Sequence, residues 1–150
     1  MLDIVFINST QERSFTEAWF RRIITTVLKY TPYRQTSVSV SINLIEPKRM
    51  RTLNATHRHK DAPTDVLSFP LQYAETRIAK KGALIPLGDL FLCPSVIKAR
   101  AKEQRTAYKT HLQFLTIHGL LHLAGYDHEK NEQDKRTMEA KERRIQKDLT

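Results

Sequence analysis

The stretch HGLLHLAGYDH, residues 118–128, decides how this sequence folds locally and where its chemistry lies. Residues four apart lie on the same face of an α-helix, so the spacing predicts a helix that presents His118 and His122 side by side. Gly125 can adopt the left-handed conformation that ends a helix. The chain can then reverse, and we expect His128 to return beside the other two histidines.

The three histidines predict a metal site. Three imidazole ligands with a fourth position open to water are typical of catalytic zinc, so we expect one Zn²⁺ ion on His118, His122 and His128. Another divalent transition metal, such as nickel, is an alternative to zinc. The alternative to a metal site is that the histidines simply pack on an amphipathic helix. His111 lies about 10 Å along the helix from His118. Cysteine is more often a small buried side chain than a ligand, so Cys93 and His111 stay outside the predicted metal set.

The same skeleton occurs in the metzincin proteases, whose pattern is H-E-x-x-H-x-x-G-x-x-H. Here Gly119 replaces the glutamate, which in those enzymes takes a proton from the zinc-bound water. Without that base, peptide hydrolysis loses about 10²–10⁴-fold in rate. RNA carries its own nucleophile, the 2′-hydroxyl, so Gly119 favours RNA over peptide as the substrate.

The net charge of +9 comes from 25 Lys and Arg against 16 Asp and Glu. The excess lies in residues 47–60, with five basic groups and no acid, and in residues 98–109, with five basic groups and one acid. Such segments favour a polyanionic partner, nucleic acid before membrane, although they can also be solvated faces. Arginine binds phosphate oxygens in pairs, which makes Arg58 a candidate. We expect Lys48, Arg49 and Arg51 to supply diffuse electrostatic attraction.

Periodicity and turn residues predict an α+β fold over residues 1–150 as one domain. Ser14 and Glu17 form a capping-box pattern before the first helix, and residues 72–87 look like an irregular excursion. The expected strands are 2–7, 36–44, 66–71 and 89–93, and the expected helices are 15–30, 47–54, 94–106, 109–124 and 131–148. We therefore expect a small mixed β-sheet of about four strands with helices packed on it, and the metal site in a cleft.

The sequence also carries expectations about location. The start, MLDIVFINST, lacks the basic n-region of a signal peptide, and no stretch approaches the roughly 20 apolar residues that span a bilayer. Cys93 is the only cysteine, so no internal disulfide is expected, which suits a reducing compartment. We expect a cytoplasmic protein without a membrane partner.

Several sequence blocks resemble the YbeY family of bacterial metal-dependent endoribonucleases. The blocks are LNATHRHKDAPTDVLSFP (53–70), LGDLFLC (87–93), HLQFLTIHGLLHLAGYDH (111–128) and the following Met138 and Glu142. The resemblance implies cleavage of single-stranded RNA, a role in maturing the 3′ end of 16S rRNA, and ribosome quality control. It also implies a mixed-sheet α+β fold with the metal in a cleft. The first 45 residues resemble the family only in general layout.

Residue by residue, the resemblance places metal binding on the three histidines and the functionally important arginine on Arg58. His57 departs from the family, which commonly has an aromatic residue there. The partners implied are single-stranded rRNA, the ribosomal small subunit or 70S particle, and associated assembly factors. No DNA partner is expected.

Asp65 and Asp127 are further catalytic candidates, with turn stabilisation as the alternative for each. Ser68 can line the cleft or can be an ordinary strand hydroxyl. The sequence as a whole predicts a zinc-dependent endoribonuclease in which Arg58 binds the phosphate. Two alternatives stay open: a metzincin-like metalloprotease, and a non-catalytic RNA-binding ribosome assembly factor whose metal is structural. Whether water or the RNA 2′-hydroxyl attacks is also left open.

Overall fold

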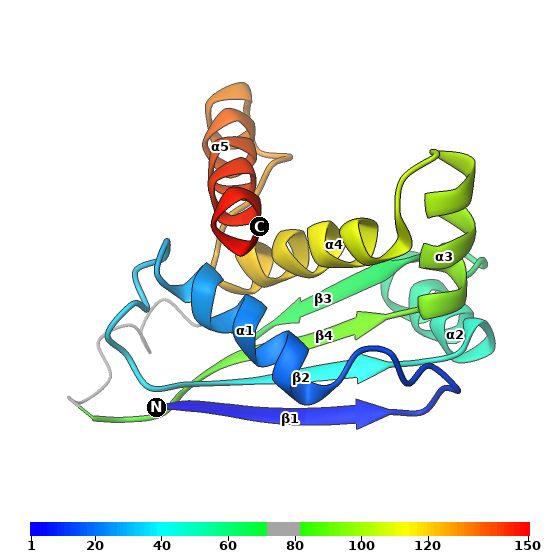
Figure 1. Ribbon diagram of the computed structural model, residues 1–150, viewed down its shortest axis with the longest axis horizontal. Coiled ribbons are helices and arrows are strands. Elements are labelled where there is room, and N and C mark those ends of the chain that lie inside the picture. Colours follow the sequence, from blue (N-terminus) through cyan, green and yellow to red (C-terminus); the bar gives the residue numbers. More distant parts are fainter. Residues whose placement is uncertain (72–81) are drawn as a thin grey trace.

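A computed structural model describes residues 1–71 and 82–150 of the protein (Figure 1). Strands and helices follow one another along the chain in this order: β1 (Leu2–Asn8), α1 (Glu17–Leu28), β2 (Val38–Leu44), α2 (Pro47–Arg58), β3 (Val66–Pro70), β4 (Ile85–Leu92), α3 (Pro94–Glu103), α4 (Tyr108–Leu123) and α5 (Glu132–Leu149). In the described residues, no helix is both long enough and apolar enough to cross a membrane.

The four strands form one mixed sheet in the order β1-β2-β4-β3. β1 and β4 run parallel to β2, and β3 runs antiparallel to β4. Helices α1 and α4 contact the sheet, and α3 and α5 pack on α4, on the same side of the sheet (Figure 1). The predicted α+β fold with a small mixed sheet is therefore confirmed.

Helix α4 is the central helix of the core, because the sheet and three other helices contact it. A Cβ atom on Gly119 would lie 2.4 Å from Cδ1 of Leu90, a fully buried residue of β4. The missing side chain therefore lets α4 approach β4 closely. With Gly119 turned to β4, His118 and His122 face the cleft beside β3, where they line the same cavity as Ser68.

Helix α5 packs through an apolar stripe. Met138, Ile145 and Leu149 are all buried. Glu142 lies within this stripe and is only 7% exposed, which is unusual for an acidic side chain. Its position therefore calls for a polar partner inside the protein.

The predicted capping box at Ser14 and Glu17 is wrong. Thr16 is the N-cap of α1, and its hydroxyl accepts a hydrogen bond from the amide of Trp19. The backbone amide of Ser14 instead donates to Glu12. Phe15 is buried in the core directly before the cap, so packing of its ring fixes where the chain enters the helix.

Helix α2 is longer than predicted, since it runs to Arg58 rather than to residue 54. His59 follows in the left-handed conformation, with φ of 58°, and ends the helix. Arg58 therefore lies in the last turn of α2 and not in a loop before the next strand.

Strand β4 begins at Ile85, before the predicted start at residue 89. Pro86 and Gly88 suggest an interruption in the sequence, but the strand continues through a register shift opposite Ser39 and Val40. The predicted excursion at 72–87 is therefore wrong for residues 85–87, and its residues 72–81 lie outside the described part of the chain.

We predict that Gly119→Ala destabilises the protein, because the new methyl group meets Leu90. Overpacking of this kind costs about 1–3 kcal/mol in the free energy of unfolding. Denaturant unfolding of Gly119→Ala, Leu90→Ala and the double variant measures it. Leu90→Ala should cost less in the Gly119→Ala background than in the wild type, and strictly additive costs would contradict the proposed contact.

Candidate metal centre

The chain reverses directly after α4, as the sequence predicts. Gly125 has a φ of 102°, in the left-handed region that favours glycine. Its amide donates to the carbonyl oxygen of His122, and the amide of Tyr126 donates to that of Leu121, both at 3.0 Å. These bonds close the helix end and direct the following residues back toward α4.

The reversal brings together the three predicted ligands. His118, His122 and His128 each offer a ring nitrogen, and these atoms all lie within 4.8 Å of one another. The ring centroids are 4.7 Å, 5.0 Å and 5.1 Å apart, taken pairwise. This trio is the one group of three or more possible metal ligands found among the described residues.

The geometry of the trio fits a divalent metal ion. Nε2 of His118 lies 3.2 Å from Nε2 of His122. Two nitrogens bound tetrahedrally at 2.0–2.1 Å from one zinc ion are separated by roughly 3.3 Å. The buried Nδ1 of His128 has no hydrogen-bond partner in the described part of the chain.

The environment of His122 favours the neutral imidazole. Burial lowers the pKa of His122 below its ordinary value, and its neighbours His118 and His128 lower the pKa further. Neutral imidazole is the form that binds a metal. The surroundings of His122 therefore favour metal binding over protonation of its ring.

Glu142 orients His118. Its Oε1 lies 2.8 Å from Nδ1 of His118, so Nδ1–H donates to the carboxyl group and Nε2 keeps a lone pair for the metal. His118 is thus the polar partner that the buried carboxyl group of Glu142 requires. An acidic residue on an otherwise apolar helix face is the sequence feature that could have indicated this contact. Glu142 was noted in the sequence only through the family resemblance.

Arg58 shares a cleft with two of the three metal-ligand candidates, His118 and His122. The cleft has a volume of about 190 Å³, and its walls consist of side chains from α2, β3 and α4: Arg58, Val66, Leu67, Ser68, Pro70, His118 and His122. Nη2 of Arg58 donates to the backbone oxygen of Ser68 at 3.4 Å. Arg58 forms no ion pair with a described residue, so its charge is available to an anion.

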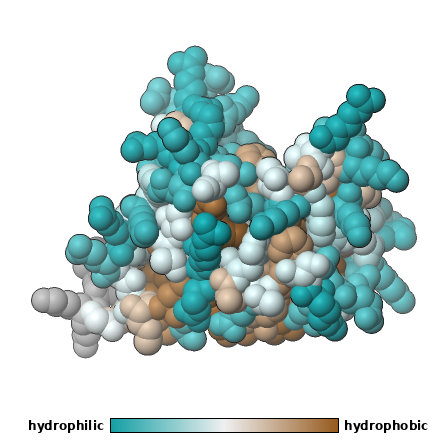
Figure 2. All heavy atoms as spheres, in the orientation of Figure 1, coloured by the Kyte–Doolittle hydropathy of each residue, from teal (hydrophilic) through white to brown (hydrophobic). Residues whose placement is uncertain are grey.

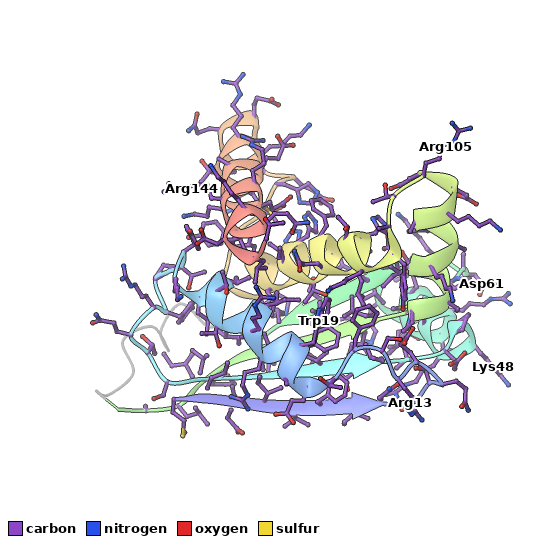
Figure 3. The ribbon with its side chains drawn as sticks, in the orientation of Figure 1. Arg13, Trp19, Lys48, Asp61, Arg105 and Arg144 are labelled. Atoms are coloured by element: carbon purple, nitrogen blue, oxygen red, sulfur yellow. The ribbon has the colours of Figure 1, made fainter. Side chains whose placement is uncertain are left out.

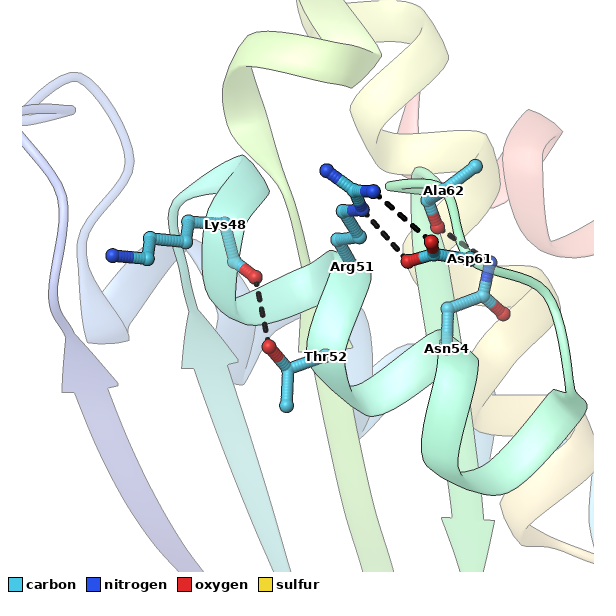
Figure 4. A network of polar contacts seen from close by, with 6 residues as sticks. All are labelled: Lys48, Arg51, Thr52, Asn54, Asp61 and Ala62. Atoms are coloured by element: carbon cyan, nitrogen blue, oxygen red, sulfur yellow. Dashed lines mark hydrogen bonds and ion pairs between the residues drawn. The ribbon is translucent and has the colours of Figure 1, made fainter.

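The loop after α2 is braced against the helix. Nδ2 of the buried Asn54 donates to the carbonyl oxygen of Ala62 at 2.8 Å, and Arg51 forms two bonds with Asp61 at 2.7 Å and 3.0 Å (Figure 4). These contacts tie residues 59–62 back onto the helix. Asp61 neutralises Arg51, whereas Arg58, about two turns further along α2, has no ion-pair partner among the described residues.

Asp65 is engaged on both oxygens. Oδ2 lies 2.8 Å from Nη1 of Arg100, and Oδ1 accepts the backbone amide of Val66 at 2.8 Å. The contacts link the start of β3 to α3, and Asp65 is not among the residues that line the cleft. Its catalytic role stays a prediction.

Asp127 lies next to His128 and is half-buried. Its Oδ1 accepts the amide of Glu129 at 2.8 Å, which stabilises the turn that follows the reversal. Its charge also raises the pKa of His122, against the larger lowering effects. Whether Asp127 accepts a proton in catalysis stays a prediction.

The other histidine and cysteine residues discussed from the sequence lie outside the trio. His111 is buried on α4, outside the group of possible ligands. Cys93 is the buried N-cap of α3, and burial raises the pKa of its thiol. The exposed His57 ring lies 4.9 Å from the ring of Phe69 in an edge-on contact, so it has an aromatic neighbour.

The start of α3 lies close to α2. Met50 of α2 and Val96 of α3 pack in the same apolar cluster. Lys48 and Arg105 point outward at one side of the molecule, and Arg144 projects from α5 at the other side (Figure 3). Arg58 is the basic residue among those that line the cleft.

Comparisons with known proteins agree on one family. The profile described as "Endoribonuclease YbeY" matches residues 5–150. The protein named endoribonuclease YbeY of Pseudomonas entomophila is 37% identical over 150 residues, covering 99% of this chain and 90% of that protein. Its namesake in Acinetobacter baumannii is 37% identical over 131 residues, covering 87% and 82%.

A third similar protein is the endoribonuclease YbeY of Geobacillus thermodenitrificans, 43% identical over 109 residues, covering 71% of this chain and 69% of that protein. Among solved structures, the solution structure of TM1509 from Thermotoga maritima is similar, with a TM-score of 0.61 and 26% sequence identity. That similarity covers 97% of this chain and 87% of the other.

We predict that Zn²⁺ stabilises the protein through the three histidines. At about 100 times its dissociation constant, a ligand that binds only the folded state adds about 2.7 kcal/mol to the free energy of unfolding. Thermal unfolding with zinc and with a chelator measures this shift. His122→Ala should abolish the shift, whereas His57→Ala, at an exposed histidine outside the trio, should keep it. A shift that survives His122→Ala would refute the assignment.

We also predict that Glu142→Ala weakens zinc binding by about 10- to 100-fold, because His118 loses the group that fixes its ring. Glu142→Gln keeps an acceptor and should weaken binding less. Glu139→Gln on the same helix is the control and should leave affinity unchanged. Competitive titration with a zinc indicator measures these affinities. Loss of stability with unchanged zinc affinity would show that Glu142 only fills space.

Proposed function

Because the chain belongs to the endoribonuclease YbeY family, we propose that it is a zinc-dependent endoribonuclease acting on single-stranded RNA. One observation carries the proposal: the guanidinium of Arg58, which forms no ion pair with a described residue, lines the same cleft as the metal-ligand candidates His118 and His122. Phosphodiester cleavage needs a positive group on the phosphate together with activation of the attacking oxygen. The cleft offers residues suited to both.

Each residue has a defined task in this proposal. Arg58 binds the oxygens of the scissile phosphate through its planar fork and stabilises the charge that develops there. Zinc bound to the trio would supply a Lewis acid and lower the pKa of a coordinated water. Glu142 contacts Nδ1 of His118 at 2.8 Å, which would leave Nε2 of the same ring available to the ion.

The packing around Gly119 argues against the metalloprotease alternative. A glutamate at this position would place its Cβ against Leu90, at 2.4 Å, and point into the core instead of the cleft. The general base of the metzincins therefore has no room here. The 2′-hydroxyl of RNA supplies a nucleophile that needs no such residue.

We further propose that the substrate in the cell is rRNA, at the 3′ end of the 16S molecule, within the small subunit or the 70S particle in the cytoplasm. The basic composition of residues 47–60 and 98–109 supports an extended RNA partner. Ribosome quality control and contacts with assembly factors belong to the same proposal. Binding through phosphates should weaken as salt rises.

Cleavage of a labelled single-stranded RNA tests the function. We predict that His118→Ala loses both zinc and cleavage, whereas Arg58→Ala keeps stoichiometric zinc and loses about 10²–10³-fold in the rate constant. Arg58→Lys should recover part of the rate, since a point charge replaces the fork only partly. The product ends identify the nucleophile: a 2′,3′-cyclic phosphate marks attack by the 2′-hydroxyl.

Arg51→Ala is the matched control, because Arg51 lies on the same helix but is paired with Asp61 outside the cleft (Figure 4). Its cleavage rate should stay near that of the wild type. Zinc-loaded wild type that binds rRNA but never cuts it would favour the non-catalytic assembly factor. Peptide cleavage that requires His122, without RNA cleavage, would favour the metalloprotease.

A further inference from the structure

Phe114 is an aromatic side chain in an unusual position. Among the described Phe, Tyr and Trp residues it is the one exposed by more than a third, at 39%. It lies on α4, one helical turn before His118. An exposed phenyl ring beside a polar site has apolar surface that a ligand can cover.

The ring of Phe114 has a fixed partner. Its centroid lies 6.1 Å from that of His118, and the two ring planes differ by 28°, a stacked arrangement. His118 is held in turn by Glu142 at 2.8 Å. The orientation of the phenyl ring is thus tied to that of a metal-ligand candidate, so a base resting on the ring would be placed relative to the metal centre.

The surroundings of Phe114 suit a single strand of RNA. α4 is contacted by both α3 and α5, and the molecular surface is hollowed between these two helices (Figure 2). Exposed cations lie on α3, in the turn after it and at the start of α4: Lys102, Arg105 and Lys109. Single-stranded nucleic acids bind surfaces that combine aromatic faces with basic side chains.

We propose that Phe114 is a stacking platform for one base of the RNA strand, at the nucleotide neighbouring the phosphate that enters the cleft of Arg58 and His118. This inference rests on the proposed function and adds a subsite to it. A base can lie on the ring only if it is free of a pairing partner and turned out of a stack, which is true of single strands and not of duplexes. Phe114 therefore contributes to the choice of single-stranded substrates.

The test is a series of single-stranded RNA oligonucleotides, each lacking one base at a different position. For the zinc-loaded wild type, removal of one particular base should raise KM by about tenfold, the effect expected from losing one base–aromatic stack. For Phe114→Ala, KM for the intact RNA should already be raised about tenfold, and removal of that base should have no further effect. Phe114→Trp should restore the wild-type pattern.

Phe114→Leu separates stacking from packing, since leucine covers His118 but offers no π-face. It should behave like Phe114→Ala, while zinc stoichiometry stays at the wild-type value in both variants. Val5→Ala, at a 50% exposed apolar residue of β1, is the control and should leave KM unchanged.

Two outcomes overturn the proposal in different ways. Wild type that cuts RNA while Phe114→Leu matches it at every position of the series shows that the ring only packs against His118. Wild type that neither binds nor cuts RNA overturns the proposed function itself, and the stacking platform with it.

Discussion

The close contact between α4 and β4 at Gly119 is the constraint on which the candidate site depends. Because Gly119 has no side chain, the helix lies against Leu90 with this position turned to the sheet. The residues on the adjacent face, His118 and His122, are then turned to the cleft beside β3. The same contact places Leu90 where the side chain of a protease-type glutamate would begin. The close packing of α4 on β4 and the absence of that general base therefore have one physical cause.

The second constraint comes from the buried acid of α5. A carboxyl group that is only 7% exposed needs a polar partner, and Glu142 finds it in Nδ1 of His118. One hydrogen bond therefore both joins α5 to α4 and orients a metal-ligand candidate. An ion held by the trio would also stabilise the packing of α5 on α4, because His118 would bind the ion and Glu142 together.

The sequence predicted what short-range spacing determines. The helix predicted over residues 109–124 and observed over 108–123, the turn at Gly125 and the return of His128 all follow from positions within 20 residues of one another. The sequence did not predict the start of β4, because pairing with β2 carries the strand through Pro86 and Gly88. Nor did residue spacing predict the contact of Glu142 with His118, since it joins two helices whose relative packing is a long-range property.

Arg51 and Arg58 show why charge alone does not identify a binding residue. Both lie on α2, and both are exposed in a segment without acids from residue 47 to 60. Asp61 lies just beyond that segment and neutralises Arg51, which braces the loop after the helix. The turn at His59 leaves Arg58 at the cleft, opposite His118 and His122. The fold thus engages Arg51 in an ion pair with Asp61, whereas Arg58 forms no ion pair with a described residue and lines the cleft.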